Sequence, residues 1–192
     1  FNVRTTLHDY IGSIGKYFVA DVSMDFDLPY RLREIEQMAM QVTGVKKVEG
    51  WQFVSGEMLD TKNMVLENIN IFGPPAQSKL IEPILVAGRW IEVDDVRRLA
   101  VSEAVYKYFP NLKPGDMMRL KIDGRDQNWE VVGIFKFVDR EGVLAYAPYE
   151  YISQLNHKAN RSSSYRIVVD RHDRPYQNAM AEKLDKFFRD HG

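Results

Sequence analysis

The chain has 192 residues, of which 26 are basic and 27 acidic, giving a formal net charge of −1. Hydrophobic side chains make up 45% of it and aromatic ones 12%, enough to fill the core of one large domain or two small ones. The balanced charge, without a long run of one sign, argues against a nucleic-acid partner. The absence of cysteine excludes disulfides, thiolate metal sites and a cysteine nucleophile.

The sequence begins at Phe1 instead of a methionine, and no signal segment with a basic and then an apolar part is visible. No apolar run approaches the roughly 18 residues that are needed to span a bilayer. We therefore expect an excised piece of a longer protein.

The first part of the chain predicts a β-α-β order. Apolar residues at helical spacing predict an amphipathic leader helix over residues 1–16. Residues 17–26 alternate between apolar and polar side chains, which is typical of a half-buried strand. Asp27 is expected to cap a helix with Pro29 in its first turn, and residues 45–55 to return as a second strand.

The middle of the chain reads as mostly β-structure. Asp123-Gly124 is a strong turn signal and predicts a hairpin between the two apolar segments that flank it. The elements expected here are strands over residues 64–72 and 99–101, a helix over 103–109 that Ser102 caps, and hairpin strands over 117–122 and 129–138.

The last part returns to alternating strands and helices. Strands are expected over residues 143–147 and 165–170, and Pro148 and Pro175 are expected to open the two helices that follow them. Because the first and last parts are alike, we expect them to form one subdomain with the middle inserted into it, and the two termini to lie close together.

The predicted fold class is therefore α+β, with a split βαβ subdomain and an inserted β-rich subdomain. The expected boundaries are residues 1–57 and 139–192 for the split subdomain and residues 58–138 for the insert.

Two sets of residues are candidates for catalytic groups. Asp94 and Asp95 are neighbours and are expected to point apart, whereas acid/base catalysis needs two carboxylates that converge on one bond. His172, in a charged cluster, would need a nucleophile from Ser162–Ser164. A solvated, charged turn accounts for each set of residues without a catalytic role. The sequence contains no nucleophile-elbow motif and no zinc-binding motif.

The remaining candidates also favour structural roles. Gly12 and Gly15 do not match a nucleotide-binding loop. Trp90 and Trp51 could anchor a partner, but core packing is the expectation for Trp90, after Gly88 at the end of an apolar segment. We assign no catalytic, cofactor-binding or metal-ligating residue and expect no cofactor.

An ordered set of short motifs resembles the extracytoplasmic (periplasmic core) domain of MacB/FtsX-like ABC transporter permeases. The likeness extends to residues 29–51 and 171–173 and so covers most of the chain. The motifs are Gly88-Arg89-Trp90, Val101-Ser102, Pro114-Gly115-Asp116 and Val131-Val132-Gly133-Ile134.

The resemblance implies a domain between two membrane helices, on the periplasmic face of the bacterial cell membrane. The split subdomain would be the membrane-proximal, porter-like part, and residues 58–138 the sabre-like part. Residues 1–16 would continue a membrane helix as a stalk. The stretch from Gly88 to Asp95 would then be a structural corner.

Such permeases are non-enzymatic mechanotransmitters that convert ATP-driven helix motion into handling or expulsion of a substrate. The implied partners are a second copy of the permease, a separate cytoplasmic ATPase subunit, and a periplasmic adaptor or lipoprotein. The alternative is an FtsX-like scaffold that recruits and activates a cell-wall hydrolase. A stand-alone hydrolase that uses His172 is the third hypothesis.

Overall fold

The computed structural model describes residues 1–7, 20–137 and 142–192. It divides into two compact units, which are treated separately below. The terminal unit comprises Phe1–Gln52, Gln77–Glu82 and His157–Gly192, and the barrel unit comprises Phe53–Ala76 and Pro83–Asn156. Strand β3 (Val45–Leu59) begins in the terminal unit and ends in the barrel unit.

The sheet of the terminal unit has the order β1-β2-β10-β3. Its strands are β1 (Val3–Leu7), β2 (Val22–Arg31), β10 (Arg161–Val169) and the first part of β3. β10 lies between β2 and β3 and is antiparallel to both, so β2 and β3 run in the same direction. The expected β-α-β order of this part of the chain is therefore present, with a later strand between its two strands.

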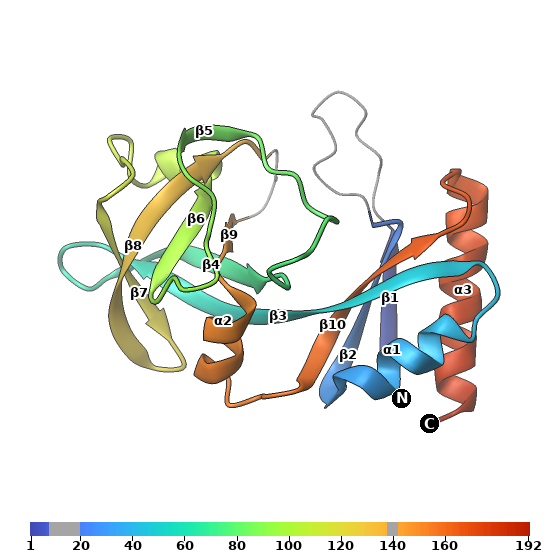
Figure 1. Cartoon of the computed structure of the whole chain (residues 1–192). Helices are drawn as coiled ribbons and strands as arrows, with labels where there is room; N and C mark the ends of the chain where they lie inside the picture. The colour runs from blue at the N-terminus through green and yellow to red at the C-terminus, as the bar shows by residue number, and fades with distance from the viewer. Residues whose placement is uncertain (8–19, 138–141) are drawn as a thin grey trace. The chain divides into compact units, whose positions relative to one another are not determined.

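Helices α1 (Leu32–Met40) and α3 (Arg174–Asp190) cover one face of this sheet (Figure 1). α3 begins as its sequence indicates, because the Asp173 carboxylate accepts a hydrogen bond from the Tyr176 amide and Pro175 occupies the first turn. Both helices bury their apolar faces against alternate residues of β2 and β10. This core includes Val22, Met24, Ile35, Ala39, Tyr165, Ile167, Met180, Leu184 and Phe188.

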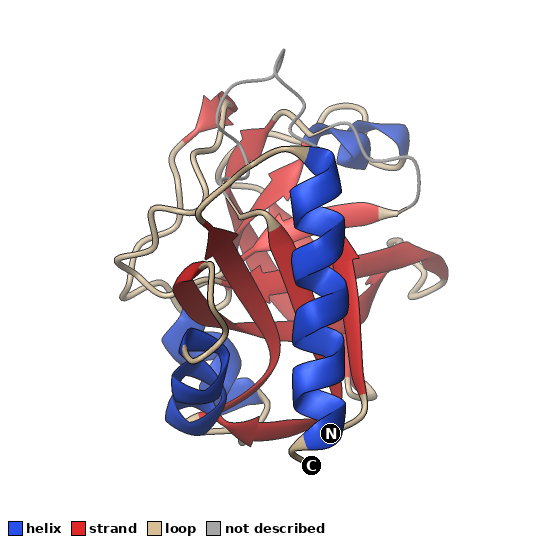
Figure 2. Cartoon of the chain, turned by 90° about the vertical axis from the view of Figure 1, so that its right-hand side faces the viewer, coloured by secondary structure: helices blue, strands red, loops and turns tan. Residues whose placement is uncertain are grey.

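The two ends of the chain lie side by side in the terminal unit, as expected (Figure 2). A Cβ atom added to Gly192 would lie 2.0 Å from the Phe1 nitrogen. The Phe1 ring packs against Tyr30 at the end of β2 and against Phe188 in the last turns of α3, with centroid distances of 4.6 and 5.6 Å.

The barrel unit is a closed ring of strands in the order β3-β4-β9-β6-β8-β7, with β7 pairing back to β3. Its core is filled by inward side chains such as Trp129, Ile69 and Leu120, as in other small barrels. The elements are β4 (Val65–Gly73), β5 (Leu85–Gly88), β6 (Arg98–Ser102), the 3-10 helix η1 (Glu103–Lys107), β7 (Met117–Ile122), β8 (Arg125–Phe135), β9 (Val143–Tyr146) and α2 (Tyr149–Leu155).

The predicted leader helix over residues 1–16 is wrong for its described part. Val3–Leu7 is an edge strand, and the remainder of that segment lies outside the described residues. Val3 is buried and Arg4 exposed, and the alternation continues along β1. The β-branched Val3, Thr5 and Thr6 favour such a strand.

The helix expected from Pro29 begins three residues later, at Leu32, because β2 continues through Pro29 to Arg31. The strand tolerates this proline because β1 pairs only as far as Phe26, so the sheet needs no amide donor at Pro29 on that side. Asp27 is therefore not a helix cap.

The expected boundaries at residues 57/58 and 138/139 also need correction. The structure places β9 and α2 in the barrel unit, because β9 pairs with β4 and β6 and thereby completes the ring. Residues 77–82 belong instead to the terminal unit, where Leu80 and Ile81 are buried. The 3-10 helix η1 replaces the expected helix over 103–109, and the Ser102 hydroxyl does not cap it but accepts a bond from the Leu144 amide.

Candidate functional site

The corner at Gly88 is formed by two glycines that bring β5 and β8 into close contact. Gly88 has a φ of 73°, and a Cβ atom on it would lie 2.2 Å from the Val132 carbonyl oxygen. Its partner on β8 is Gly133, where a Cβ atom would lie 2.0 Å from the Arg89 carbonyl oxygen. No larger side chain fits at either position without a backbone shift, so the expected positive φ or close approach at Gly88 is confirmed.

The loop between β5 and β6 is organised around Asp95, whose side chain is buried. Its carboxylate accepts two bonds from the Arg89 guanidinium, of 2.8 and 2.9 Å, and one of 2.8 Å from the Glu92 amide. The Arg98 guanidinium lies 3.5 Å from the Asp95 Oδ1 atom. Burial acts to raise the pKa of Asp95, but these bonds and the two guanidinium charges outweigh it, so the pKa is lowered.

Asp94, by contrast, is exposed, and its carboxylate forms no hydrogen bond or ion pair with the described residues. The two neighbouring carboxylates therefore have different environments, and only Asp95 is engaged by the loop. They do not form the convergent pair that acid/base catalysis requires. The reading of both as solvated turn residues is wrong for Asp95, which the sequence alone did not distinguish from Asp94.

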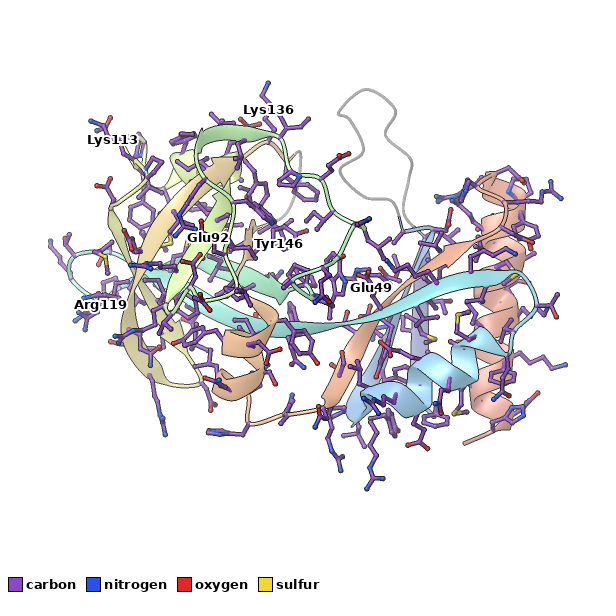
Figure 3. All side chains as sticks on the ribbon, in the orientation of Figure 1. Glu49, Glu92, Lys113, Arg119, Lys136 and Tyr146 are labelled. Carbon is purple, nitrogen blue, oxygen red and sulfur yellow. The ribbon has the colours of Figure 1, made fainter. Side chains whose placement is uncertain are left out.

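Trp90 packs against Phe135 of β8 and Tyr146 of β9, at centroid distances of 5.8 and 5.2 Å, and these three rings are separate from the cluster that fills the barrel core. The indole is half-buried, and the carbonyl of Trp90 accepts a bond from Arg89. Figure 3 marks Tyr146 and Glu92, which flank this corner in the barrel unit. These contacts agree with core packing rather than partner binding.

His172 contacts a carboxylate that its sequence neighbourhood does not predict. Its Nδ1 atom lies 2.8 Å from Oδ1 of Asp21, which is buried. Asp21 also accepts bonds from the Gln177 amide group and the Val169 backbone amide, at 2.9 and 2.8 Å. Asp21 thus ties the start of β2 to the end of β10 and to the first turns of α3.

The serines of β10 do not supply the nucleophile that the hydrolase hypothesis requires for His172. The Ser162 hydroxyl donates to the Trp51 carbonyl, and the Ser164 hydroxyl donates to Asp25 at 2.7 Å. Within the described residues, no serine hydroxyl is bonded to His172. The geometry therefore provides a histidine–aspartate pair without a nucleophile.

A second polar cluster lies on the sheet face of the terminal unit opposite to the helices. The buried Arg166 guanidinium stacks over the Trp51 ring at 4.9 Å and donates to Ser164. Glu49, marked in Figure 3, accepts bonds from the Trp51 indole and the Ser78 hydroxyl, at 3.1 and 2.6 Å. Sequence reasoning missed this cluster, although Arg166, a charged residue within the alternating strand over residues 165–170, is a visible signal.

Neither unit offers a metal site within its described residues, since no group of three or more His, Asp or Glu side chains converges there. An open pocket of about 470 Å³ in the barrel unit is lined by the loop after η1. Its lining includes one basic residue and no acidic one, so it provides no acid/base pair. Its lining residues are Tyr106, Pro110, Asn111, Leu112 and Lys113.

In the described parts of the chain, no helix is both long and apolar enough to cross a bilayer.

The chain has the fold of the extracytoplasmic domains of ABC-type transporter permeases. The extracellular domain of the noncanonic ABC-type transporter YknZ from Gram-positive bacteria matches 84% of this chain and 84% of its own, with 18% identity and a TM-score of 0.52. The periplasmic region of MacB from Actinobacillus actinomycetemcomitans matches 96% of this chain and 82% of its own, with 16% identity and a TM-score of 0.53.

These structures confirm the resemblance inferred from the ordered motifs at the level of the fold. The first is named as the extracellular domain of an ABC-type transporter, and the second as a periplasmic region. No protein-family model matches the sequence, and no curated protein does.

Proposed function

We propose that this chain is the extracytoplasmic domain of an ABC transporter permease, at the periplasmic face of a bacterial cell membrane. In this proposal the domain is non-catalytic and transmits ATP-driven motion of the membrane helices to a substrate outside the membrane. The terminal unit is the membrane-proximal, porter-like part with its split βαβ sheet, and the barrel unit is the sabre-like part.

The observation that carries the proposal is the position of the two chain ends. Phe1 and Gly192 leave the terminal unit side by side, beside the same aromatic cluster of Phe26, Tyr30 and Phe188. This geometry suits a domain inserted between two membrane helices, because both helices can then enter the bilayer close together. The fold shared with YknZ and MacB supports the same placement.

The absence of a complete catalytic set among the described residues supports a mechanical role. His172 lacks a bonded nucleophile, and Asp95 is neutralised by Arg89. The partners in this proposal are a second copy of the permease, a cytoplasmic ATPase subunit, and a periplasmic adaptor, lipoprotein or cell-wall hydrolase that receives the motion.

The proposal is tested by loosening the two connections in the full-length permease. A flexible glycine-serine linker inserted before Phe1 and after Gly192 should abolish complementation of a strain that lacks the gene, while ATP hydrolysis continues. The same linker in the exposed turn at Lys62–Asn63 serves as the control and should be tolerated. Full complementation with both terminal linkers would overturn the proposal.

A further inference from the structure

The end of the terminal unit that holds both termini also carries four cationic side chains: Arg31, Arg33, Lys158 and Arg161. Arg31 and Arg161 lie directly opposite each other on β2 and β10. Like charges at directly opposed positions of a sheet destabilise it, so the fold itself does not account for this pair.

None of these four cations forms an ion pair within the described part of the chain. Two carboxylates lie on α1 near these cations: Glu34 in the first turn, and the half-buried Glu36, whose charge interacts with that of Arg33 and whose carboxylate accepts a bond from the Gly50 amide. Asp27 is engaged by the Asn2 amide, and Asp185 by Arg189. The chain as a whole has a net charge of −1, so this excess of positive charge is local.

An exposed apolar side chain accompanies the cations. Leu28, three residues before Arg31 on the same strand, is 62% exposed. The Arg161 guanidinium reaches the same segment, where it donates to the Pro29 carbonyl at 3.4 Å. Cations beside an exposed apolar residue are the pattern of a protein surface that meets the boundary between lipid headgroups and acyl chains. The planar guanidinium group of arginine can donate two parallel hydrogen bonds to the oxygens of one phosphate.

The position of this cluster identifies the surface that it faces. Phe1 packs on Tyr30, which precedes Arg31 in β2 and pairs with Ser162 of β10. The chain ends and the cations therefore lie at one end of the terminal unit. This step rests on the proposed function, in which that end faces the bilayer.

We infer that Arg31, Arg33, Lys158 and Arg161, with Leu28, bind the phosphate headgroups of an anionic phospholipid surface. This contact holds the terminal unit in a fixed orientation on the bilayer, so that displacement of the membrane helices moves the unit as a rigid body.

The test measures co-sedimentation of the 192-residue chain with vesicles of phosphatidylglycerol and phosphatidylcholine, and with vesicles of phosphatidylcholine alone. The chain should partition onto the anionic vesicles only, and added salt should release it. Each cation near the surface is worth about a fivefold change in partition coefficient, so Arg31→Ala/Arg161→Ala should lower it by roughly 25-fold.

The matched control is Lys46→Ala/Lys183→Ala, which removes the same charge from the opposite end of the unit, where the Lys183 amine donates to the Thr43 carbonyl. This variant should partition as the parent chain does. An equal loss in both double variants would show general charge attraction and overturn the inference. Thermal melts of each variant separate loss of binding from loss of folding.

A second readout uses the absence of natural cysteine in this chain. A polarity-sensitive fluorophore on Leu28→Cys should report an apolar environment with anionic vesicles, whereas one on Met40→Cys, also exposed, should not. Equal responses at both sites would overturn the inference. So would binding to polyglutamate without binding to vesicles, which would indicate an acidic protein partner. If vesicle binding fails while the terminal linkers still uncouple the transporter, only the headgroup contact is wrong.

Discussion

Arg89 and Asp95 form a two-bond ion pair that closes the loop between β5 and β6, with N–O distances of 2.8 and 2.9 Å. The carboxylate is almost fully buried, whereas the guanidinium keeps 39% of its side-chain surface exposed. This pair explains why an arginine and the second of two aspartates follow the glycine of the corner. One aspartate is a structural anchor, and the other is a surface residue.

We expect Asp95→Asn to lower the free energy of unfolding by about 2–3 kcal/mol, because a hydrogen bond to a buried charged group is worth roughly that amount. Asp94→Asn is the matched control and should change it by less than about 0.5 kcal/mol, as exposed substitutions do. Urea denaturation of both variants measures the difference. Similar effects at the two positions would refute the assignment of Asp95 as the anchor.

The contribution of Asp95 should depend on pH in a defined direction. Its pKa in the folded protein is lowered from the ordinary value of 3.8, so its stabilisation is fully present above 3.8 and is lost as the pH falls through the lower folded value. The stability difference between the parent chain and Asp95→Asn should therefore be constant near neutral pH and shrink below about 3.8. A difference that grows on acidification would have the wrong sign for this account.

Trp90→Ala should destabilise the barrel unit by about 3 kcal/mol, because it removes a half-buried ring from Phe135 and Tyr146. Gly88→Val should cost roughly 3 kcal/mol or more, since its Cβ atom would meet the Val132 carbonyl at a positive φ. Thermal melts measure both. Unchanged melting temperatures would remove the structural reading of the corner and favour Trp90 as an exposed partner anchor.

The sequence predicted the turns and helix starts whose backbone conformation is set by adjacent residues. Asp123 and Gly124 both have positive φ, at 51° and 71°, and join β7 to β8 as the hairpin signal indicates. Pro175 and Asp173 open α3 in the same way. These features could be predicted because the required backbone conformation depends on adjacent residues.

The features that sequence reasoning missed depend on contacts between distant segments. Asp21 is one of the polar residues of the alternating segment over residues 17–26, yet it is buried because Gln177, His172 and Val169 surround it. The stacking of Arg166 on Trp51 likewise requires β10 to pair beside β3. No spacing along the chain specifies either pairing.

The purified chain should hydrolyse no generic ester, phosphate or peptide substrate and should bind no ATP. The physical reason is that the structure brings no nucleophile to His172, whose bonded partner is Asp21. Standard chromogenic assays and calorimetry with ATP measure this. Hydrolysis that His172→Ala abolishes would support the alternative of a stand-alone enzyme, and Asp95→Asn is a control that should leave any such activity in place.

The central claim is that the domain moves with the nucleotide state of the transporter. In a reconstituted permease and ATPase from which any cysteines outside this domain have been removed, Lys46→Cys places a single spin label on an exposed site of each copy of the domain. Pulsed electron paramagnetic resonance then measures the distance between the two labels. We expect the distance distribution to shift between the nucleotide-free and ATP-trapped states, and flexible linkers at Phe1 and Gly192 to abolish the shift. Identical distributions in both states of a transporter that hydrolyses ATP would contradict the account.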